Sequence, residues 1–332
     1  MIFRLTTIPL VLALGACSST APMTRTATTG YAEPAYAAPS VSGSTLAPTM
    51  LAATSSPSPT LARQEKEGQG GLPHPLEVTL MGTSYQESDF EDTNDELEVS
   101  RVAVHGTYIM PVESGVWRFR AVVEESSYET KVGGTFDDAF EIGAGATYYQ
   151  PGPEWSWYAT LNLNEGLGDG ADFGDGTYFE GGGGVSYNVQ DNLRIGLALV
   201  GRTQLEEDVE VAPFPIIEWE INDRSRIGFL QSSDPALGYT YELTDQYEWY
   251  IAVQRMQRQY RLDEDVLPDA AFVDEETGIR TGFVYRDGDA ITVEAFVGAA
   301  QRTLLLDRDG EERGETDIET APFFGITGSF SF

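Results

Sequence analysis

Cysteine, histidine and lysine are scarce in this chain of 332 residues. It contains one cysteine, Cys17, two histidines, His74 and His105, and two lysines, Lys66 and Lys131. One cysteine cannot form a disulfide framework, and so few cysteines and histidines cannot build a zinc cluster. There is also no apolar run of about 18 residues, which excludes a transmembrane helix.

Basic residues are few compared with acidic ones. The chain has 20 Lys and Arg against 53 Asp and Glu, for a formal net charge of −33. This excess of negative charge repels nucleic acid, so we expect no nucleic-acid partner. Charged residues make up 22% of the chain and aromatics 11%, with 35 glycines. That composition suits a fold of many strands and turns and is not that of a fully disordered chain.

The first 17 residues have the features of a secretory signal peptide. Arg4 precedes a short apolar stretch, and small residues follow it. Leu14-Gly15-Ala16-Cys17 resembles the lipobox of bacterial lipoproteins. That resemblance implies cleavage before Cys17 and lipidation of its side chain. The alternative is an ordinary signal peptide with an incidental cysteine.

Residues 18–71 are dominated by Ala, Ser, Thr and Pro and have no hydrophobic period. Such a composition is typical of a flexible linker, so we expect a disordered tether here. Residues 72–332 then form the expected folded domain.

The region after the linker consists of segments in which apolar and polar residues alternate. Alternation with a period of two predicts β-strands with one apolar and one polar face. We expect about fourteen strands, with twelve as the alternative because three of the segments, 213–222, 225–233 and 236–243, are short. The expected strands are 76–86, 98–110, 116–128, 138–149, 155–164, 177–189, 192–203, 213–222, 225–233, 236–243, 246–262, 278–286, 289–305 and 317–332.

The last segment alternates clearly and ends on phenylalanine. Phe324, Ile326, Phe330 and Phe332 fall on one face. At these residues the sequence resembles bacterial outer-membrane β-barrel proteins. In that class a last strand of this kind is read by the barrel-assembly machinery, so the resemblance implies this machinery as a partner and Phe330 and Phe332 as the assembly signal.

The expected connections alternate between short turns and longer loops, as in antiparallel up-and-down transmembrane barrels. The resemblance implies an all-β barrel in the outer membrane, in contact with its lipid, with short turns on the periplasmic side. The segments Pro213–Trp219 and Ala321–Phe324 also resemble an uncharacterised family of such barrels, known only as a domain of unknown function. A soluble β-sandwich is the competing fold.

A set of charged residues shares the polar face of the expected strands. Because a charge facing lipid at mid-membrane costs roughly 2–4 kcal/mol for Arg, we expect these residues to line the lumen. They either line a narrow wet pore or lock into a network that plugs the barrel. The set is Arg101, His105, Arg118, Arg120, Glu124, Glu141, Arg194, Arg202, Glu218, Arg226, Arg280 and Glu294.

The longer loops carry many acidic residues, including Asp169, Asp172 and the run Asp274-Glu275-Glu276. We interpret them as solvated loops facing outside; weak divalent-cation binding, bridging to lipopolysaccharide, is the alternative. No cofactor and no other metal site are expected.

Two functional hypotheses follow. The first is a narrow passive, porin-like channel for small solutes or ions. The second is a closed structural or surface-binding barrel without transport. An enzyme is not expected, because His105 stands without a recognisable nucleophile motif.

Overall fold

The computed structural model describes residues 75–90, 96–130, 137–205, 209–230, 236–263, 267–308 and 311–332. The expected signal segment, Cys17 and the linker lie outside these ranges. No helix within these ranges is long and apolar enough to cross a membrane.

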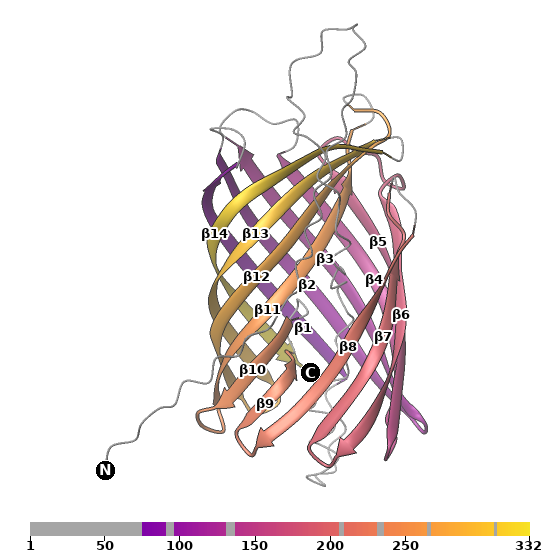
Figure 1. Ribbon diagram of the computed structural model, residues 1–332, viewed down its shortest axis with the longest axis vertical. Helices are drawn as coiled ribbons and strands as arrows, with labels where there is room; N and C mark the ends of the chain where they lie inside the picture. Colours follow the sequence, from indigo (N-terminus) through magenta and orange to yellow (C-terminus); the bar gives the residue numbers. More distant parts are fainter. Residues whose placement is uncertain are drawn as a thin grey trace, which may run out of the picture. The chain divides into compact units, whose positions relative to one another are not determined.

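The described residues form a closed antiparallel barrel of fourteen strands, which confirms the expected fold and strand count. Figure 1 shows the strands wrapped at a slant around a common axis. The strands are β1 Leu76–Asp89, β2 Glu96–Val112, β3 Gly115–Thr130, β4 Asp138–Gln150, β5 Trp155–Gly168, β6 Thr177–Gln190, β7 Leu193–Arg202, β8 Glu210–Asn222, β9 Ser225–Phe229, β10 Ala236–Glu242, β11 Tyr247–Arg261, β12 Ala270–Asp287, β13 Ile291–Arg308 and β14 Glu311–Ser331.

The last strand closes the barrel against the first, as the alternation in both segments predicts. β1 and β14 pair in a regular antiparallel register that runs from Glu77 opposite Ser331 to Tyr85 opposite Phe323. The Phe332 amide also donates to the Leu76 carbonyl at 2.8 Å. Closure leaves no strand edge at this seam, which is the usual requirement for a barrel in a bilayer.

The strand boundaries differ from expectation mainly at the end of the barrel that carries the longer loops. There β12 begins at Ala270 rather than at 278, and β14 begins at Glu311 rather than at 317. Acidic residues interrupt the apolar alternation in both stretches, so the sequence pattern is weak where the strands continue. In contrast, β9 is shorter than expected and ends at Phe229.

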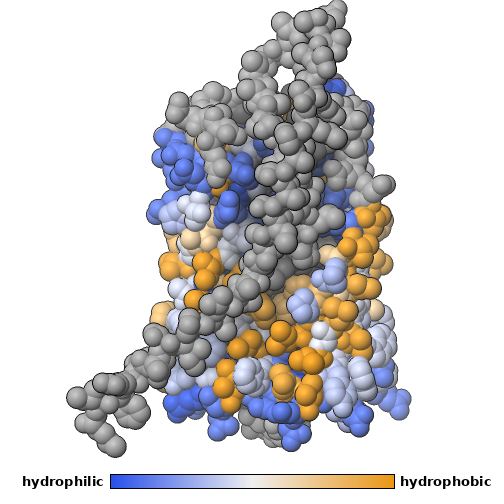
Figure 2. Space-filling view, viewed as in Figure 1, coloured by the Kyte–Doolittle hydropathy of each residue, from blue (hydrophilic) through white to orange (hydrophobic). Residues whose placement is uncertain are grey.

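Side chains alternate between the outside and the inside of the wall. In β7, Ile195, Leu197 and Leu199 are exposed on the outside, whereas Ala198, Val200 and Arg202 are buried inside. On the face in view, Figure 2 shows apolar side chains around the middle and lower part of the barrel, with hydrophilic residues nearer both ends. This banded exterior is what a bilayer-spanning barrel requires.

Several aromatic ring pairs lie near the short turns, and Figure 1 shows these turns at the lower end of the barrel. The ring centroids of Trp117 and Tyr148 lie 4.9 Å apart, and those of Trp155 and Tyr187 lie 4.8 Å apart. We call this end the short-turn end and the opposite one the long-loop end. Aromatic belts of this kind mark the boundary between membrane and water.

Strand β11 departs from the regular cylinder at the point where its neighbours end. β9 and β10 are the shortest strands, and Figure 1 shows them near the short-turn end. Beyond them β11 continues without β10 and meets β5, where Arg261 bridges Leu167 in parallel. At the long-loop end, β11 to β14 and β1 to β5 therefore form a narrower closed ring of nine strands.

Glycine makes this close approach of β11 to β5 possible. A Cβ atom on Gly166 would lie 2.0 Å from the Gln259 carbonyl oxygen, so a larger residue would collide with the backbone of β11. Contacts with the β5–β6 and β7–β8 connections also hold β11 in place. The Arg261 side chain donates to the Asp175 carbonyl at 3.1 Å, and the Gln259 side chain donates to the Thr203 carbonyl at 3.1 Å.

Candidate functional site: the charged lumen

The structure places all twelve charged residues singled out in the sequence on the inner face of the wall, where the alternation puts them. Two pairs within this set meet directly. Arg120 donates to His105 Nδ1 at 2.6 Å, and Arg194 donates to Glu218 at 2.9 Å. Four of the others, Arg101, Glu124, Arg202 and Arg226, pair with charged residues that the sequence analysis did not select. The set is Arg101, His105, Arg118, Arg120, Glu124, Glu141, Arg194, Arg202, Glu218, Arg226, Arg280 and Glu294.

Four fully buried charges fill the lumen in its long-loop half. Arg101 on β2 and Arg302 on β13 face Asp274 and Glu276 on β12, and we call these residues the four-charge cluster. Arg101 pairs with Asp274 and, at 3.0 Å, with Glu276. Arg302 pairs with the same two carboxylates at 2.9 and 2.7 Å. The side chains of Asp274 and Glu276 have 0% exposure, so water has no access to them.

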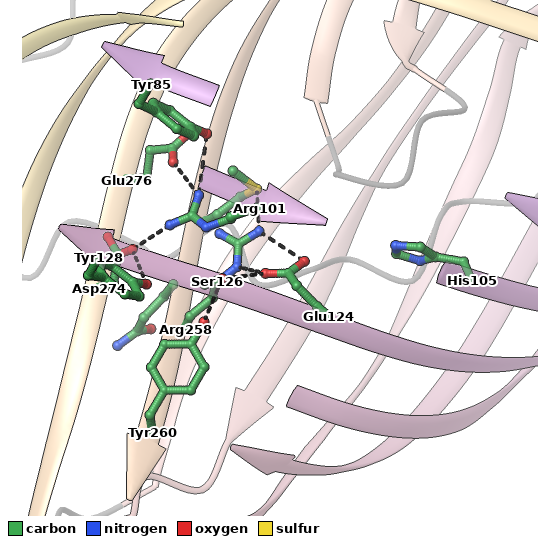
Figure 3. A network of polar contacts seen from close by, with 12 residues as sticks. Tyr85, Arg101, His105, Glu124, Ser126, Tyr128, Arg258, Tyr260, Asp274 and Glu276 are labelled. Carbon is green, nitrogen blue, oxygen red and sulfur yellow. Dashed lines mark hydrogen bonds and ion pairs between the residues drawn. The ribbon is translucent and has the colours of Figure 1, made fainter. Parts of the chain in front are cut away.

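Tyrosine and glutamine side chains add hydrogen bonds to this cluster, while Asp274 Oδ1 and the Nε atoms of Arg101 and Arg302 have no partner among the described residues. Tyr85 donates to Glu276 at 3.0 Å, Tyr128 to Asp274 at 2.8 Å and Gln254 to Glu276 at 2.8 Å. The Arg302 guanidinium also lies 3.9 Å from the centre of the Tyr85 ring. Buried charges are tolerated only when they are paired and hydrogen-bonded in this way. Figure 3 shows part of this network, with contacts from β1, β2, β3 and β12 converging.

A second pair of contacts ties β11 to the wall through one face and one edge. On its inner face Arg258 donates to Glu124 of β3 at 2.5 Å, as Figure 3 shows. At its edge, Arg202 of β7, which also pairs with Glu180, donates to the Gln257 carbonyl at 3.0 Å. The arginines of β11, Arg255, Arg258 and Arg261, do not all share one parity. The inward course of β11 explains that, because both faces of its upper part are covered by protein.

A polar cavity of about 80 Å³ lies beside these contacts, between β2–β7 and β11. Three arginines and three glutamates line it, with amide and phenol groups. The His105 Nε2 atom is buried there, with no partner among the described residues. The charged lining consists of Arg120, Arg202, Arg258, Glu124, Glu141 and Glu180, and His105, Asn162, Asn164 and Tyr178 add polar groups.

The lumen is more accessible in its short-turn half. Arg194 and Glu218 pair at 2.9 Å with side chains 21% and 22% exposed. Arg226 and Arg286 both contact Glu248, at 2.9 and 3.4 Å. The Arg194–Glu218 pair, Arg226 and Arg286 are partly exposed, whereas Glu248 is buried, so this half of the lumen is partly accessible to water.

One prediction about charge placement was wrong. The run Asp274-Glu275-Glu276 was expected in an outward-facing loop, but it lies within β12, with Asp274 and Glu276 buried inside the barrel. The acidic run hides the strand because it offers no apolar alternation. A usable signal was present nonetheless. Every second residue of a strand points to the same side, so counting back from the inward-facing Arg280 in steps of two places Glu276 and Asp274 on the inner face.

The sequence analysis also missed Arg302, Glu180 and Tyr85, each of which lies on an expected strand. Their inward direction follows from parity, but their convergence depends on how the strands meet across the lumen. Pairings such as Arg101 with Asp274 join residues far apart in the chain, so local spacing gives no indication of them.

The expected assembly and surface features keep the status of predictions. Phe330 and Phe332 are exposed at the short-turn end of β14. Asp169, Asp172 and Asp175 are exposed in the β5–β6 loop. Among the described residues, no group of three or more His, Cys, Asp or Glu side chains is arranged to hold a metal ion.

Comparison with known proteins gives a likeness in structure only. No protein-family model matches the chain, including any for the uncharacterised barrel family considered above, and no curated protein sequence matches it. Its structural neighbours are outer-membrane β-barrel proteins. An outer membrane channel from Pseudomonas putida F1 is 10% identical, with a TM-score of 0.45, over 78% of this chain and 97% of the other.

Two further structures show a similar degree of likeness. A Pseudomonas aeruginosa FadL homologue is 10% identical, with a TM-score of 0.42, over 77% of this chain and 90% of the other. The NanC porin is 11% identical, with a TM-score of 0.37, over 77% of this chain and all of the other, 100%.

Proposed function

We propose that this protein is a bacterial outer-membrane channel for small solutes or ions, and not an enzyme. The observation that carries the proposal is the polar cavity inside the closed barrel, lined by Arg120, Arg202, Glu141 and their neighbours. A ring of fixed charges of both signs in a confined, hydrated lumen is the device by which pores select solutes.

The outer face of the barrel supports a membrane location. Apolar side chains such as Val102, Leu161 and Phe283 are exposed on strands that are paired on both sides. Exposed apolar area of this extent is unfavourable in water and favourable against lipid. The long-loop end would then face outside and the short turns the periplasm.

The four-charge cluster favours a second function, that of a closed barrel. Arg101, Arg302, Asp274 and Glu276 occupy the long-loop half of the lumen without access to water. A solute moving along the axis would have to pass them. The protein is therefore either a channel with a narrow or closable outer end, or a barrel without transport.

Recordings in planar lipid bilayers separate these two functions. The wild-type protein is compared with the double variant Asp274→Ala/Arg302→Ala, which removes one ion pair and leaves Arg101 beside Glu276. We expect low conductance from the wild type and higher conductance from the double variant, because the variant opens space without stranding a charge.

The matched control is Glu275→Ala/Arg255→Ala, which removes a neighbouring ion pair of 3.2 Å outside the cluster. It should conduct like the wild type. Folded barrels are identified in each preparation by heat-modifiable gel migration. Absence of conductance from both the wild type and the double variant would overturn the channel proposal and leave the closed barrel.

The remaining expectations are proposals of the same kind. The exposed acids of the β5–β6 loop are solvated in our interpretation, with weak divalent-cation or lipopolysaccharide contact as the alternative. Recognition of Phe330 and Phe332 by the barrel-assembly machinery would be tested by the yield of folded barrel after Phe332→Ser.

A further inference from the structure

The wall of the barrel is interrupted beside β8. Along its whole length β8 pairs with β7, from Glu210 opposite Arg202 to Trp219 opposite Leu193. On its other side it pairs with β9 at three positions only, all between Trp219 and Asn222. Within the described residues, positions 210–218 therefore have a strand partner on one side only.

Two prolines fall on this free edge. The Glu220 amide donates to the Asn192 carbonyl at 2.9 Å, which shows that even-numbered residues of β8 direct their backbone groups toward β7. Since the β7–β8 register has no bulge, Pro213 and Pro215 direct theirs to the opposite side. Proline has no N–H to donate, so it is confined to strand edges that need no partner. The sequence itself thus prevents a strand from pairing here.

The strand that would close the wall is engaged elsewhere. Beyond β10, the edge of β11 that would face β8 gives its Gln257 carbonyl to Arg202 and brings Arg261 against Leu167 of β5. The short strands β9 and β10 separate β8 from β11 only near the short-turn end, as Figure 1 shows. Above them the wall between β8 and β11 has no strand among the described residues.

The interruption lies at the level of the apolar exterior. The β7 residues opposite Pro215 and Pro213 are Leu197 and Leu199, whose outward side chains are 53% and 56% exposed. The carbonyl oxygens of the two prolines point to the free edge. In hydrocarbon an unpaired carbonyl costs several kcal/mol, so bare backbone is tolerated at this depth only where water or a polar ligand reaches it.

The inner side of the same edge is apolar and then becomes polar. Phe214 and Ile216 of β8 are buried inside with Tyr158, Ala198 and Phe229. The charged cavity lies on the inner side of the neighbouring strands β6 and β7, with Tyr178 and Arg202 in its lining. A molecule moving inward from the lipid would therefore meet the apolar side chains of β8 first and charged side chains after them.

We infer that the gap between β8 and β11 is a side opening through which an amphipathic molecule passes between the bilayer and the lumen, its hydrocarbon part against Phe214 and Ile216 and its polar head toward the charged cavity. This inference rests on the proposed channel function and names its substrate class. It also supplies a route that avoids the four-charge cluster.

Quenching of tryptophan fluorescence by brominated lipid tests the opening. The five native tryptophans are replaced by phenylalanine in the full-length protein, and single Phe→Trp variants are reconstituted in vesicles of brominated phosphatidylcholine. Phe214→Trp reports the inner side of the gap. Phe296→Trp is the matched control, because Phe296 is equally inward and buried but lies on β13, which is paired on both sides. Phe283→Trp, exposed on β12, reports full contact with lipid.

We expect Phe214→Trp to lose fluorescence in brominated vesicles as Phe283→Trp does, whereas Phe296→Trp keeps it. Fluorescence retained at position 214 as at 296 would overturn the side opening, and so would equal quenching at all three positions. If Phe214→Trp gives no heat-modifiable folded band, Ile216→Trp is judged by the same outcomes.

Conductance measured on the same preparations keeps this inference separate from the channel proposal. Conductance without quenching at position 214 would leave the channel and remove the side opening. Quenching without conductance would leave the opening and remove a continuous pore.

Discussion

The two halves of the lumen use the same kinds of charged residue with opposite results. In the long-loop half, Asp274 and Glu276 each face both Arg101 and Arg302, and the four side chains are fully buried. In the short-turn half, pairs such as Arg194 with Glu218 stand apart and remain partly exposed. The composition of the inner face therefore does not decide whether a lumen is open. The degree of confinement does.

The difference in confinement originates in β9, β10 and β11. The short hairpin of β9 and β10 holds the wall at full width near the short turns. Where the hairpin ends, β11 moves inward to β5, and the ring shrinks around the charges. The same departure of β11 leaves β8 without a partner, so closure of the axis and interruption of the wall are two effects of one strand.

The largest effect is expected from breaking the confined half. Asp274→Ala leaves Arg101 and Arg302 short of a buried partner, which costs about 3–5 kcal/mol in the free energy of unfolding. Urea titration of the folded, heat-modifiable band in vesicles measures this. The control is Glu275→Ala, the next residue, whose side chain is 26% exposed in its pair with Arg255. Equal losses from the two variants would mean that burial of an acidic side chain does not decide how much its ion pairs contribute to stability.

A somewhat smaller effect should follow from pushing β11 away from β5. Gly166→Val places a side chain against the Gln259 carbonyl, and overpacking of this kind costs about 1–3 kcal/mol. Gly82→Val is the control, since nothing lies within 4 Å of a Cβ at that position. The same urea titration compares them. A stable Gly166→Val protein with unchanged conductance would show that the contact between β11 and β5 does not narrow the lumen.

Much of the fold followed from the sequence because strand alternation and turn residues are local signals. Fourteen strands, the closure of β1 on β14 and the inward direction of Arg101 and Arg202 all depend on parity alone. The four-charge cluster could not be predicted in the same way. Its members come from β2, β12 and β13, and their meeting depends on how far the ring contracts, which no local pattern encodes.

The prolines of β8 lie between these two cases. Pro213 and Pro215 occupy alternate positions of an expected strand, and proline in that position indicates an unpaired edge. Their meaning became clear only when the Glu220 amide fixed which side of β8 faces β7. The sequence therefore indicated that β8 has an unpaired edge, but it did not indicate which side of β8 that edge is on.

In the accessible half, loss of an ion pair should matter little. Arg194→Ala removes the partner of Glu218 in a hydrated setting, so we expect a loss of at most about 1 kcal/mol, reduced further by salt. Urea titration at low and high ionic strength measures both effects. A loss as large as that from Asp274→Ala, independent of salt, would contradict the view that the short-turn half is partly accessible to water.

The smallest change in stability, with the most specific functional result, is expected at the cavity between the two halves. Glu124 and Glu180 are neutralised by Arg258 and Arg202, whereas Glu141 forms no ion pair among the described residues. Glu141→Gln therefore removes an ionisable carboxyl group from the cavity without breaking an ion pair. If solutes pass this cavity, the reversal potential in a KCl gradient should shift toward anion preference.

The control is Glu125→Gln. Glu125 is exposed on the opposite face of β3, so this variant should leave the reversal potential unchanged. A shift with Glu125→Gln but not with Glu141→Gln would place the conducting path outside the cavity, and the contrast between the two halves would then concern stability alone.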